Sequence, residues 1–178
     1  MTIIGNNNVA AGNWDESLDS FIVGCDYVAP ITGKIISISM YINPDAERPH
    51  QCAIYSQDRA TLIAQTEERT IGAADYAWET FNFAVRPTLT QGTTYYLMGW
   101  SGGGGNTNIK LINGDAGKLL SDDDHVYDSE NWPADLSGDD TYENFGCLIY
   151  GTYQEVTEKK QTMTLTGDMI FPNIKYTT

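Results

Sequence analysis

Hydrophobic and polar residues alternate in several short runs along this chain, most clearly over residues 34–42. Every second residue from Ile36 to Ile42 is large and apolar, and Ser37 and Ser39 lie between them. A period of two is typical of a β-strand with one buried face. The run therefore predicts a strand whose isoleucine and methionine side chains join a hydrophobic core.

The longest strand-rich stretch is 78–100, which we expect to organise the rest of the fold. Phe81 and Phe83 alternate with polar neighbours, and residues 94–100 are rich in aromatic and large apolar side chains. Pro87 lies between these runs and has no N–H to donate to a strand ladder. The pattern predicts a hairpin of two strands joined by a turn segment, with Trp78 and Trp100 in the core.

Other runs predict further short strands, whereas residues 5–20 and 121–144 read as loops with little to bury. The further strands are expected at 21–28, 50–56, 60–68, 108–112, 118–120 and 145–153. No stretch shows the 3.6-residue period of a helix. Many short strands separated by turn residues predict an all-β fold, a β-sandwich of the jelly-roll type.

The alternation returns near the C-terminus, after a polar and charged segment. We expect one sandwich domain over 1–153, a linker over 154–160 and an appended strand or hairpin over 161–178. Within that tail, Gly167-Asp168 suits a two-residue hairpin turn. Its apolar residues predict a docking surface, either on its own sandwich or on a neighbouring subunit.

Charge narrows the possible partners. The formal net charge is −14 and the isoelectric point is near 4.2. Nucleic acid is not an expected partner, because binding to phosphates requires Lys and Arg. An anionic membrane surface is disfavoured for the same reason, and no apolar run reaches the length of a membrane-spanning helix. The N-terminal residues lack the basic and apolar regions of a secretory signal peptide.

The three cysteines leave two alternatives open. Cys25, Cys52 and Cys147 each lie in a strand-like run and lack metal-site spacing. The simpler interpretation is three small buried apolar side chains, and the other is one disulfide with one free thiol.

An ordered set of core and turn residues runs through residues 20–153. It comprises Val23-Gly24, Ala29-Pro30, Gly33-Lys34-Ile35, Ala53-Ile54-Tyr55-Ser56, Trp78, Thr80-Phe81, Pro87, Leu89-Thr90, Gly92-Thr93-Thr94-Tyr95-Tyr96-Leu97, Trp132-Pro133 and Ile149-Tyr150-Gly151-Thr152-Tyr153. This set resembles β-sandwich domains of secreted and surface proteins of bacteria and archaea, which look like carbohydrate-binding modules and also occur in phage virion proteins. The resemblance implies a sandwich fold and, by analogy, glycan binding.

The acidic loop, residues 121–144, is the first candidate for a functional site. Its segment contains no Lys or Arg, so an ordered loop is expected to need a counter-cation. Ca²⁺ accepts six to eight oxygen ligands in a flexible geometry, which suits clustered carboxylates. The alternative is a solvated acidic surface. The candidate calcium ligands are Asp122, Asp123, Asp124, Asp128, Asp139 and Asp140.

Aromatic residues outside the strand interiors are the second candidate. A flat ring can stack on the C–H face of a sugar, while nearby polar groups bind its hydroxyls. Trp132, inside the acidic loop, is the leading residue; the alternative is that it closes the end of the sandwich and anchors the loop. The candidate ligand-binding residues are Trp132, Tyr127, Trp14, Tyr142 and Tyr76.

No catalytic motif is visible, so we do not expect an enzyme. The chain has two histidines and no Gly-x-Ser-x-Gly elbow. We expect a non-catalytic carbohydrate-binding or adhesion module that recognises a polysaccharide or glycan at an extracellular surface, a cell surface or a virion. The alternative is a structural subunit of a phage or virus particle or a surface filament, assembled through its termini by way of the C-terminal tail.

Overall fold

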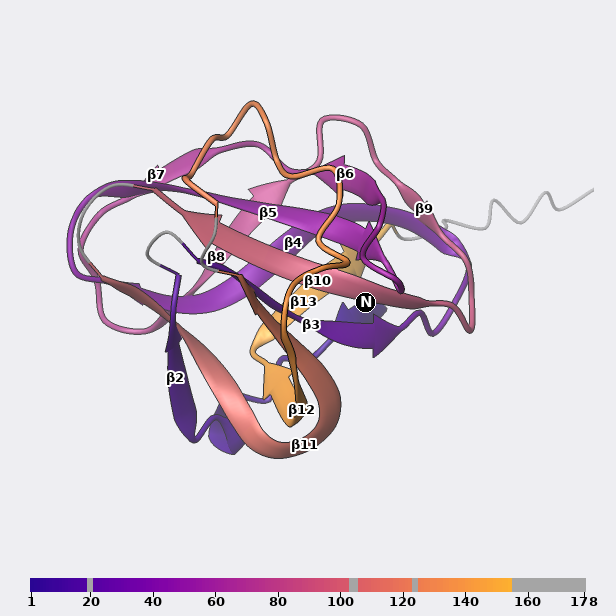
Figure 1. Cartoon of the computed structure of the whole chain (residues 1–178), viewed down its shortest axis with the longest axis horizontal. Coiled ribbons are helices and arrows are strands. Elements are labelled where there is room, and N and C mark those ends of the chain that lie inside the picture. The colour runs from indigo at the N-terminus through magenta and orange to yellow at the C-terminus, as the bar shows by residue number, and fades with distance from the viewer. Residues whose placement is uncertain (19–20, 103–105, 123–124, 155–178) are drawn as a thin grey trace, which may run out of the picture.

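The computed structural model describes residues 1–18, 21–102, 106–122 and 125–154, and these residues form an all-β structure (Figure 1). One three-residue 3₁₀ helix, η1 (Val9–Ala11), accompanies the strands, and no helix in the described part is long and apolar enough to cross a membrane. The strands are β1 (Ile3–Gly5), β2 (Trp14–Ser17), β3 (Ile22–Val28), β4 (Gly33–Pro44), β5 (Arg48–Ser56), β6 (Leu62–Gln65), β7 (Arg69–Ile71), β8 (Ala77–Asn82), β9 (Thr88–Leu89), β10 (Thr94–Ser101), β11 (Thr107–Asp122), β12 (Thr141–Cys147) and β13 (Ile149–Tyr153).

The strands form a large antiparallel, sandwich-like arrangement of two layers. One layer has the order β8–β4–β13–β1, and the other has the order β6–β5–β10–β3. Strand β11 joins them, because its first residues pair with β4 and its last residues pair with β3. Figure 1 shows β5, β10 and β3 running side by side in front of β4 and β13.

Two hydrophobic cores lie on opposite faces of the β5–β10–β3 layer. Leu97 points into the larger core, between the two layers, with Ile54 and Ile38. Tyr96 and Trp100 point the other way, into a smaller core closed by residues of the 125–140 loop. Successive residues of β10 are therefore buried on alternate faces, which explains why this strand is almost continuously apolar. The predicted burial of Trp100 is confirmed.

The hairpin expected over 78–100 is wrong, although both of its strands exist. Strand β8 pairs with β4, where Tyr41 lies opposite Trp78, and β10 pairs with β3 and β5. The chain between them crosses from one layer to the other. Alternation reports which face of a strand is buried, but it carries no information about which strand lies beside it.

Other corrections concern strand ends and irregularities. The region 5–20, expected as a loop, contains β2, and residues 108–112 and 118–120 are parts of the single strand β11. The run 145–153 divides into β12 and β13 at Leu148. The tail 161–178, and the linker apart from Gln154, lie outside the described residues.

The set of buried residues predicted for the 34–42 strand is wrong at one position. Ile38, Met40 and Ile42 are buried as expected, but Ile36 is only partly buried and Ile35 takes its place in the core. The ladder between β4 and β13 shifts register at this end, between Ser37 and Ile35. A bulge places successive residues differently from a regular strand, which accounts for the exchange.

His50 is a fully buried residue of β5 that is hydrogen-bonded at both ring nitrogens. Nδ1 lies 3.0 Å from the carbonyl oxygen of Arg48, and Nε2 lies 3.0 Å from Oγ1 of Thr107. Burial lowers the pKa of His50 to about 4, and the nearby Arg48 charge adds to this effect against the hydrogen bond to its carbonyl. The ring is therefore neutral in the folded protein at neutral pH.

Because His50 is neutral in the folded protein, we expect the protein to lose stability on mild acidification. In the unfolded chain a histidine takes up a proton near its usual pKa of about 6.5, but in the folded protein it does so only near 4. The unfolded state binds more protons between these values, so the free energy of unfolding should fall by about 2 kcal/mol from pH 7 to pH 5. Urea unfolding at each pH measures this slope.

The matched control for this measurement is the second histidine. His50→Gln should flatten the dependence on pH, whatever its effect on absolute stability, whereas His125→Gln should retain it. Equal slopes in the wild type and in His50→Gln would contradict the assignment.

Candidate functional site

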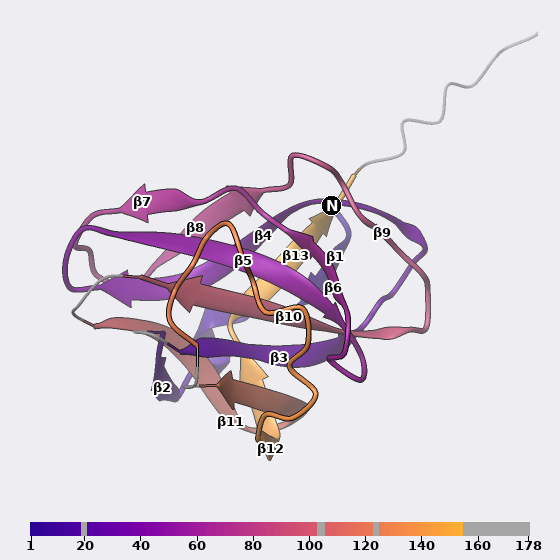
Figure 2. The same ribbon diagram turned by 45° about the horizontal axis from the view of Figure 1, so that its top comes forward.

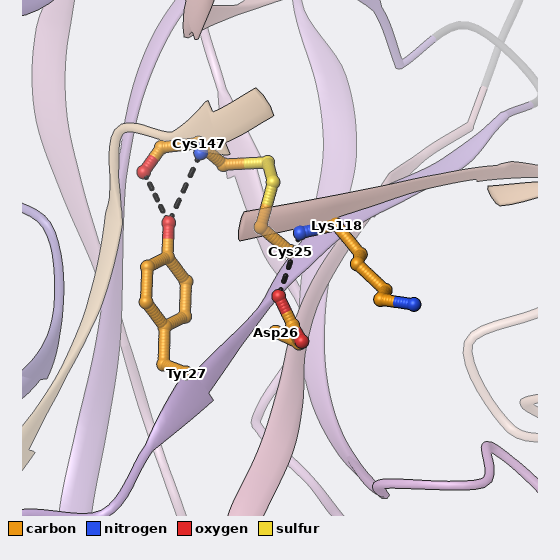
Figure 3. The surroundings of a disulfide bond; sticks show 5 residues. All are labelled: Cys25, Asp26, Tyr27, Lys118 and Cys147. Carbon is orange, nitrogen blue, oxygen red and sulfur yellow. Dashed lines mark hydrogen bonds between the residues drawn. A yellow bond between two sulfur atoms is a disulfide. The ribbon is translucent and has the colours of Figure 1, made fainter. Parts of the chain in front are cut away.

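A disulfide joins β3 and β12 beside the candidate site. Cys25 and Cys147 are joined, with their Cα atoms 5.7 Å apart, and Cys52 is a buried free thiol. Figure 3 shows the hydroxyl of Tyr27 between the backbone groups of Cys147, donating to its carbonyl oxygen at 2.6 Å and accepting from its N–H at 3.0 Å. The disulfide alternative is therefore confirmed, and the simpler interpretation of three buried thiols is wrong.

An irregularity in β12 brings two aromatic residues to the same side. Residues three apart on a regular strand point to opposite faces, yet Tyr142 and Phe145 line one pocket. Between them, Asn144 adopts a positive φ of 68°, a conformation that Asn tolerates better than most residues. The β11–β12 register shifts at the same place, between Asn113 and Lys118 of β11, and Gly114 within this segment has a φ of 95°.

The pocket beside this irregularity, here called the aromatic pocket, has a volume of about 320 Å³. Trp14 and Tyr142, both predicted as ligand-binding residues, are 53% and 50% exposed and lie 128 positions apart in the sequence. Their large exposed faces leave aromatic surface available to a ligand. The lining residues are Trp14, Glu16, Phe21, Leu119, Ser121, Tyr142 and Phe145.

Strand β2 positions one wall of the aromatic pocket. Trp14 and Glu16 lie two residues apart and share a face, whereas Asp15 points the other way and binds Nζ of Lys110 at 2.7 Å. Burial raises the pKa of Glu16, against a hydrogen bond from the backbone of Ser17 that lowers it. The pocket therefore combines aromatic surface with a partly desolvated carboxyl group.

Trp132 and Tyr127 belong to the smaller core and lie apart from the aromatic pocket. Trp132 is 5% exposed, its ring packs against Trp100 and Tyr55, and its Nε1 donates to the side-chain oxygen of Gln51. Tyr127 is half-buried and packs edge-on against Trp100 at 5.1 Å. In this arrangement Trp132 anchors the loop, and its ring faces are covered by protein.

Tyr76, the fifth predicted residue, lies on the outside of the β8–β4–β13 layer. Its hydroxyl donates to Asp15 at 2.6 Å, and Nζ of Lys110 lies 4.7 Å from its ring centroid. Burial and the bonded Asp15 both raise the pKa of Tyr76. Although burial alone would raise the pKa of Asp15, the hydrogen bonds from Lys110 and Tyr76 lower it.

Tyr76 begins a row of four half-buried rings that continues through Tyr41, Trp78 and Tyr150, here called the outer aromatic row. Neighbouring centroids lie 4.8–5.5 Å apart, but the Tyr41–Trp78 and Trp78–Tyr150 pairs are inclined by 47° and 66°. Rings inclined in this way form a packed cluster and lack the common plane of a stacking platform. Trp78, expected in the core, is therefore part of an outer cluster.

The acidic loop obtains a positive charge from outside its own segment. Arg59 reaches across from the β5–β6 connection, where its two terminal nitrogens donate to the backbone carbonyls of Asp139 and Ser137 at 2.7 and 3.2 Å. The carboxylate of Asp128 accepts bonds from the backbone of Glu130 and the side chain of Asn131. These bonds lower the pKa of Asp128, the Asn131 bond most.

The calcium prediction stays a prediction. The side chains of Asp122, Asp123 and Asp124 lie outside the described part of the structure. Among the residues that the structure describes, no group of three or more His, Cys, Asp or Glu side chains is placed to hold a metal ion.

No protein-family model matches this chain, and no curated protein matches it either. The geometry of the aromatic pocket is therefore the basis for assigning a function.

Proposed function

We propose that this chain is a non-catalytic glycan-binding or adhesion module that holds a sugar residue in the aromatic pocket. The observation that carries the proposal is the meeting of half-exposed Trp14 and Tyr142 in one concave site. Aromatic rings supply apolar faces for the C–H surface of a sugar, and Glu16 and Ser121 supply polar groups for its hydroxyls. The jelly-roll connectivity implied by the resemblance is part of this proposal.

We place the module in an oxidising compartment, on an extracellular surface, a cell surface or a virion. The Cys25–Cys147 disulfide supports this location, because disulfides persist mainly outside reducing cytosol.

The alternative, a structural subunit of a particle or filament, depends on the tail 161–178, which the structure does not describe. Native mass by light scattering, with and without EDTA, separates the two functions and also tests calcium. A large assembly would favour the structural subunit, whereas a monomer that loses thermal stability in EDTA would favour a calcium-ordered binding module.

Replacing either exposed aromatic residue of the pocket should weaken glycan binding. We expect Trp14→Ala and Tyr142→Ala each to reduce affinity at least tenfold, because each removes a ring that a sugar would contact, and tenfold is about 1.4 kcal/mol. Both side chains are half-exposed, so stability should change little. The measurement is a titration of tryptophan fluorescence against a panel of soluble polysaccharides, followed by calorimetry on any binder.

Trp78→Ala, in the outer aromatic row, is the matched control for these variants. It should leave glycan affinity within about twofold of the wild type, since its ring lies outside the aromatic pocket. If only Trp78→Ala lost glycan binding, the binding site would be at the outer aromatic row and not in the aromatic pocket. Absence of any response across the panel would reject glycan binding.

A further inference from the structure

The aromatic pocket has few polar side chains, and its one charged side chain, Glu16, is acidic. Its lining holds four aromatic residues, one aliphatic residue, Ser121 and one carboxyl group; Tyr142 supplies a second hydroxyl, and none of the lining residues is Lys, Arg or His. A neutral sugar presents several hydroxyl groups that each need a donor or acceptor when buried. Glu16, Ser121 and the hydroxyl of Tyr142 satisfy few of these, so the pocket suits a ligand with one dominant polar group.

The combination of rings and a carboxylate favours a positive charge. Aromatic faces attract a cation through their negative quadrupole, most strongly when the cation is partly desolvated. A carboxylate beside these rings adds a direct charge-assisted partner. The net charge of −14 also draws cations toward the molecule over longer distances.

The lysines of the neighbouring strand β11 are occupied elsewhere. Nζ of Lys110 lies 2.7 Å from Asp15 on the opposite side of β2, and Nζ of Lys118 lies 2.8 Å from Glu143. Partial burial raises the pKa of Glu16, because desolvation disfavours its charged form. A cationic ligand beside Glu16 would favour that charged form.

We infer that the aromatic pocket selects a cationic sugar, in which the protonated amine of a glucosamine-type residue lies against Glu16 and the aromatic rings. This inference rests on the proposed glycan-binding function and specifies its ligand class. N-acetylation removes the positive charge, so the acetylated form of the same sugar should bind more weakly.

The test compares two oligomers of equal length, a glucosamine hexamer and an N-acetylglucosamine hexamer, by calorimetry at about pH 6. Glu16→Gln removes the pocket carboxylate with little change of shape. Glu47→Gln, at an exposed position outside the pocket, removes the same charge and controls for diffuse attraction of a polycation. Repeating the titrations at high salt screens that diffuse attraction further.

We expect the glucosamine hexamer to bind at least tenfold more tightly than the acetylated one. Glu16→Gln should lose about tenfold in affinity for it, while Glu47→Gln should stay within about twofold of the wild type. Equal affinity of the wild-type protein for both hexamers, or equal losses in the two variants, would overturn the cationic preference and leave glycan binding intact. Binding of neither hexamer, with no response to the wider polysaccharide panel, would reject glycan binding itself.

Discussion

Opening the Cys25–Cys147 disulfide is expected to lower the free energy of unfolding by about 2–5 kcal/mol, near the upper end of this range. The two cysteines are separated by 122 positions, so the bond closes a loop that spans most of the described chain. In the chain-entropy account, a longer closed loop removes more conformations from the unfolded state. Urea unfolding of the double variant Cys25→Ala/Cys147→Ala measures the effect.

Reduction of the wild-type protein provides an independent comparison. Dithiothreitol should lower the stability of the wild type toward that of the double variant and should leave the double variant itself unchanged. The buried thiol of Cys52 is present in both proteins, so its chemistry cancels. Identical urea midpoints for oxidised and reduced wild type would show that this bond adds no stability.

The same substitution should also weaken ligand binding. Cys147 ends β12, which carries Tyr142 and Phe145, and Cys25 lies opposite Leu119, another lining residue of the aromatic pocket. Without the covalent bond, β12 is held to β3 by the bonds of Tyr27 to the backbone of Cys147. A looser wall reduces the preorganisation of the site, so affinity should fall even at temperatures where the variant is fully folded.

Replacing Trp132 by alanine should be the most damaging single substitution in the acidic loop. The change removes a ring packed against Trp100 and Tyr55 and leaves the side-chain oxygen of Gln51 without its donor. Large-to-small changes of this kind cost about 3–5 kcal/mol, because the surrounding side chains fill the cavity only in part. Urea unfolding gives the free energy, and limited proteolysis should reveal faster cleavage within 125–140.

Trp14→Ala is the internal control for this prediction, because it makes the same chemical change at a half-exposed site. It should alter stability by about 1 kcal/mol or less while reducing glycan affinity. The two variants thus separate anchoring from binding. Comparable stability losses at both positions would contradict the assignment of Trp132 as the anchor of the loop.

Strand positions were predictable where burial imposes a pattern on the sequence. Residues 34–42 and 94–100 lie in strands as expected, since their side chains face one or two hydrophobic cores. The edge strands β1 and β2 escaped prediction, because short strands with few buried residues show little alternation. Pairing between strands was not predictable, since partners such as Tyr41 and Trp78 are far apart in sequence.

The candidate site was predictable only in part. Trp14 and Tyr142 stood out as aromatic residues outside the strand interiors, but nothing in the sequence indicates that they meet. Phe21 and Phe145 resemble ordinary core residues by pattern, so their place in the pocket was missed. Glu16 is one of 24 acidic residues, and only the fold distinguishes it from the others. A positive φ at Asn144 likewise has no reliable signal in a single sequence.

The pairing of β1 with β13 determines how such a molecule could be tethered. Tyr153 donates its backbone N–H to the carbonyl oxygen of Thr2 at 3.0 Å, and Ile3 lies opposite Thr152. Figure 2 shows the N-terminus and the end of β13 at the upper side, whereas β2, β11 and β12 lie at the lower side. A tether attached next to Thr2 or Tyr153 would therefore hold the sandwich on one side, while β2 and β12, which carry lining residues of the aromatic pocket, lie on the other side.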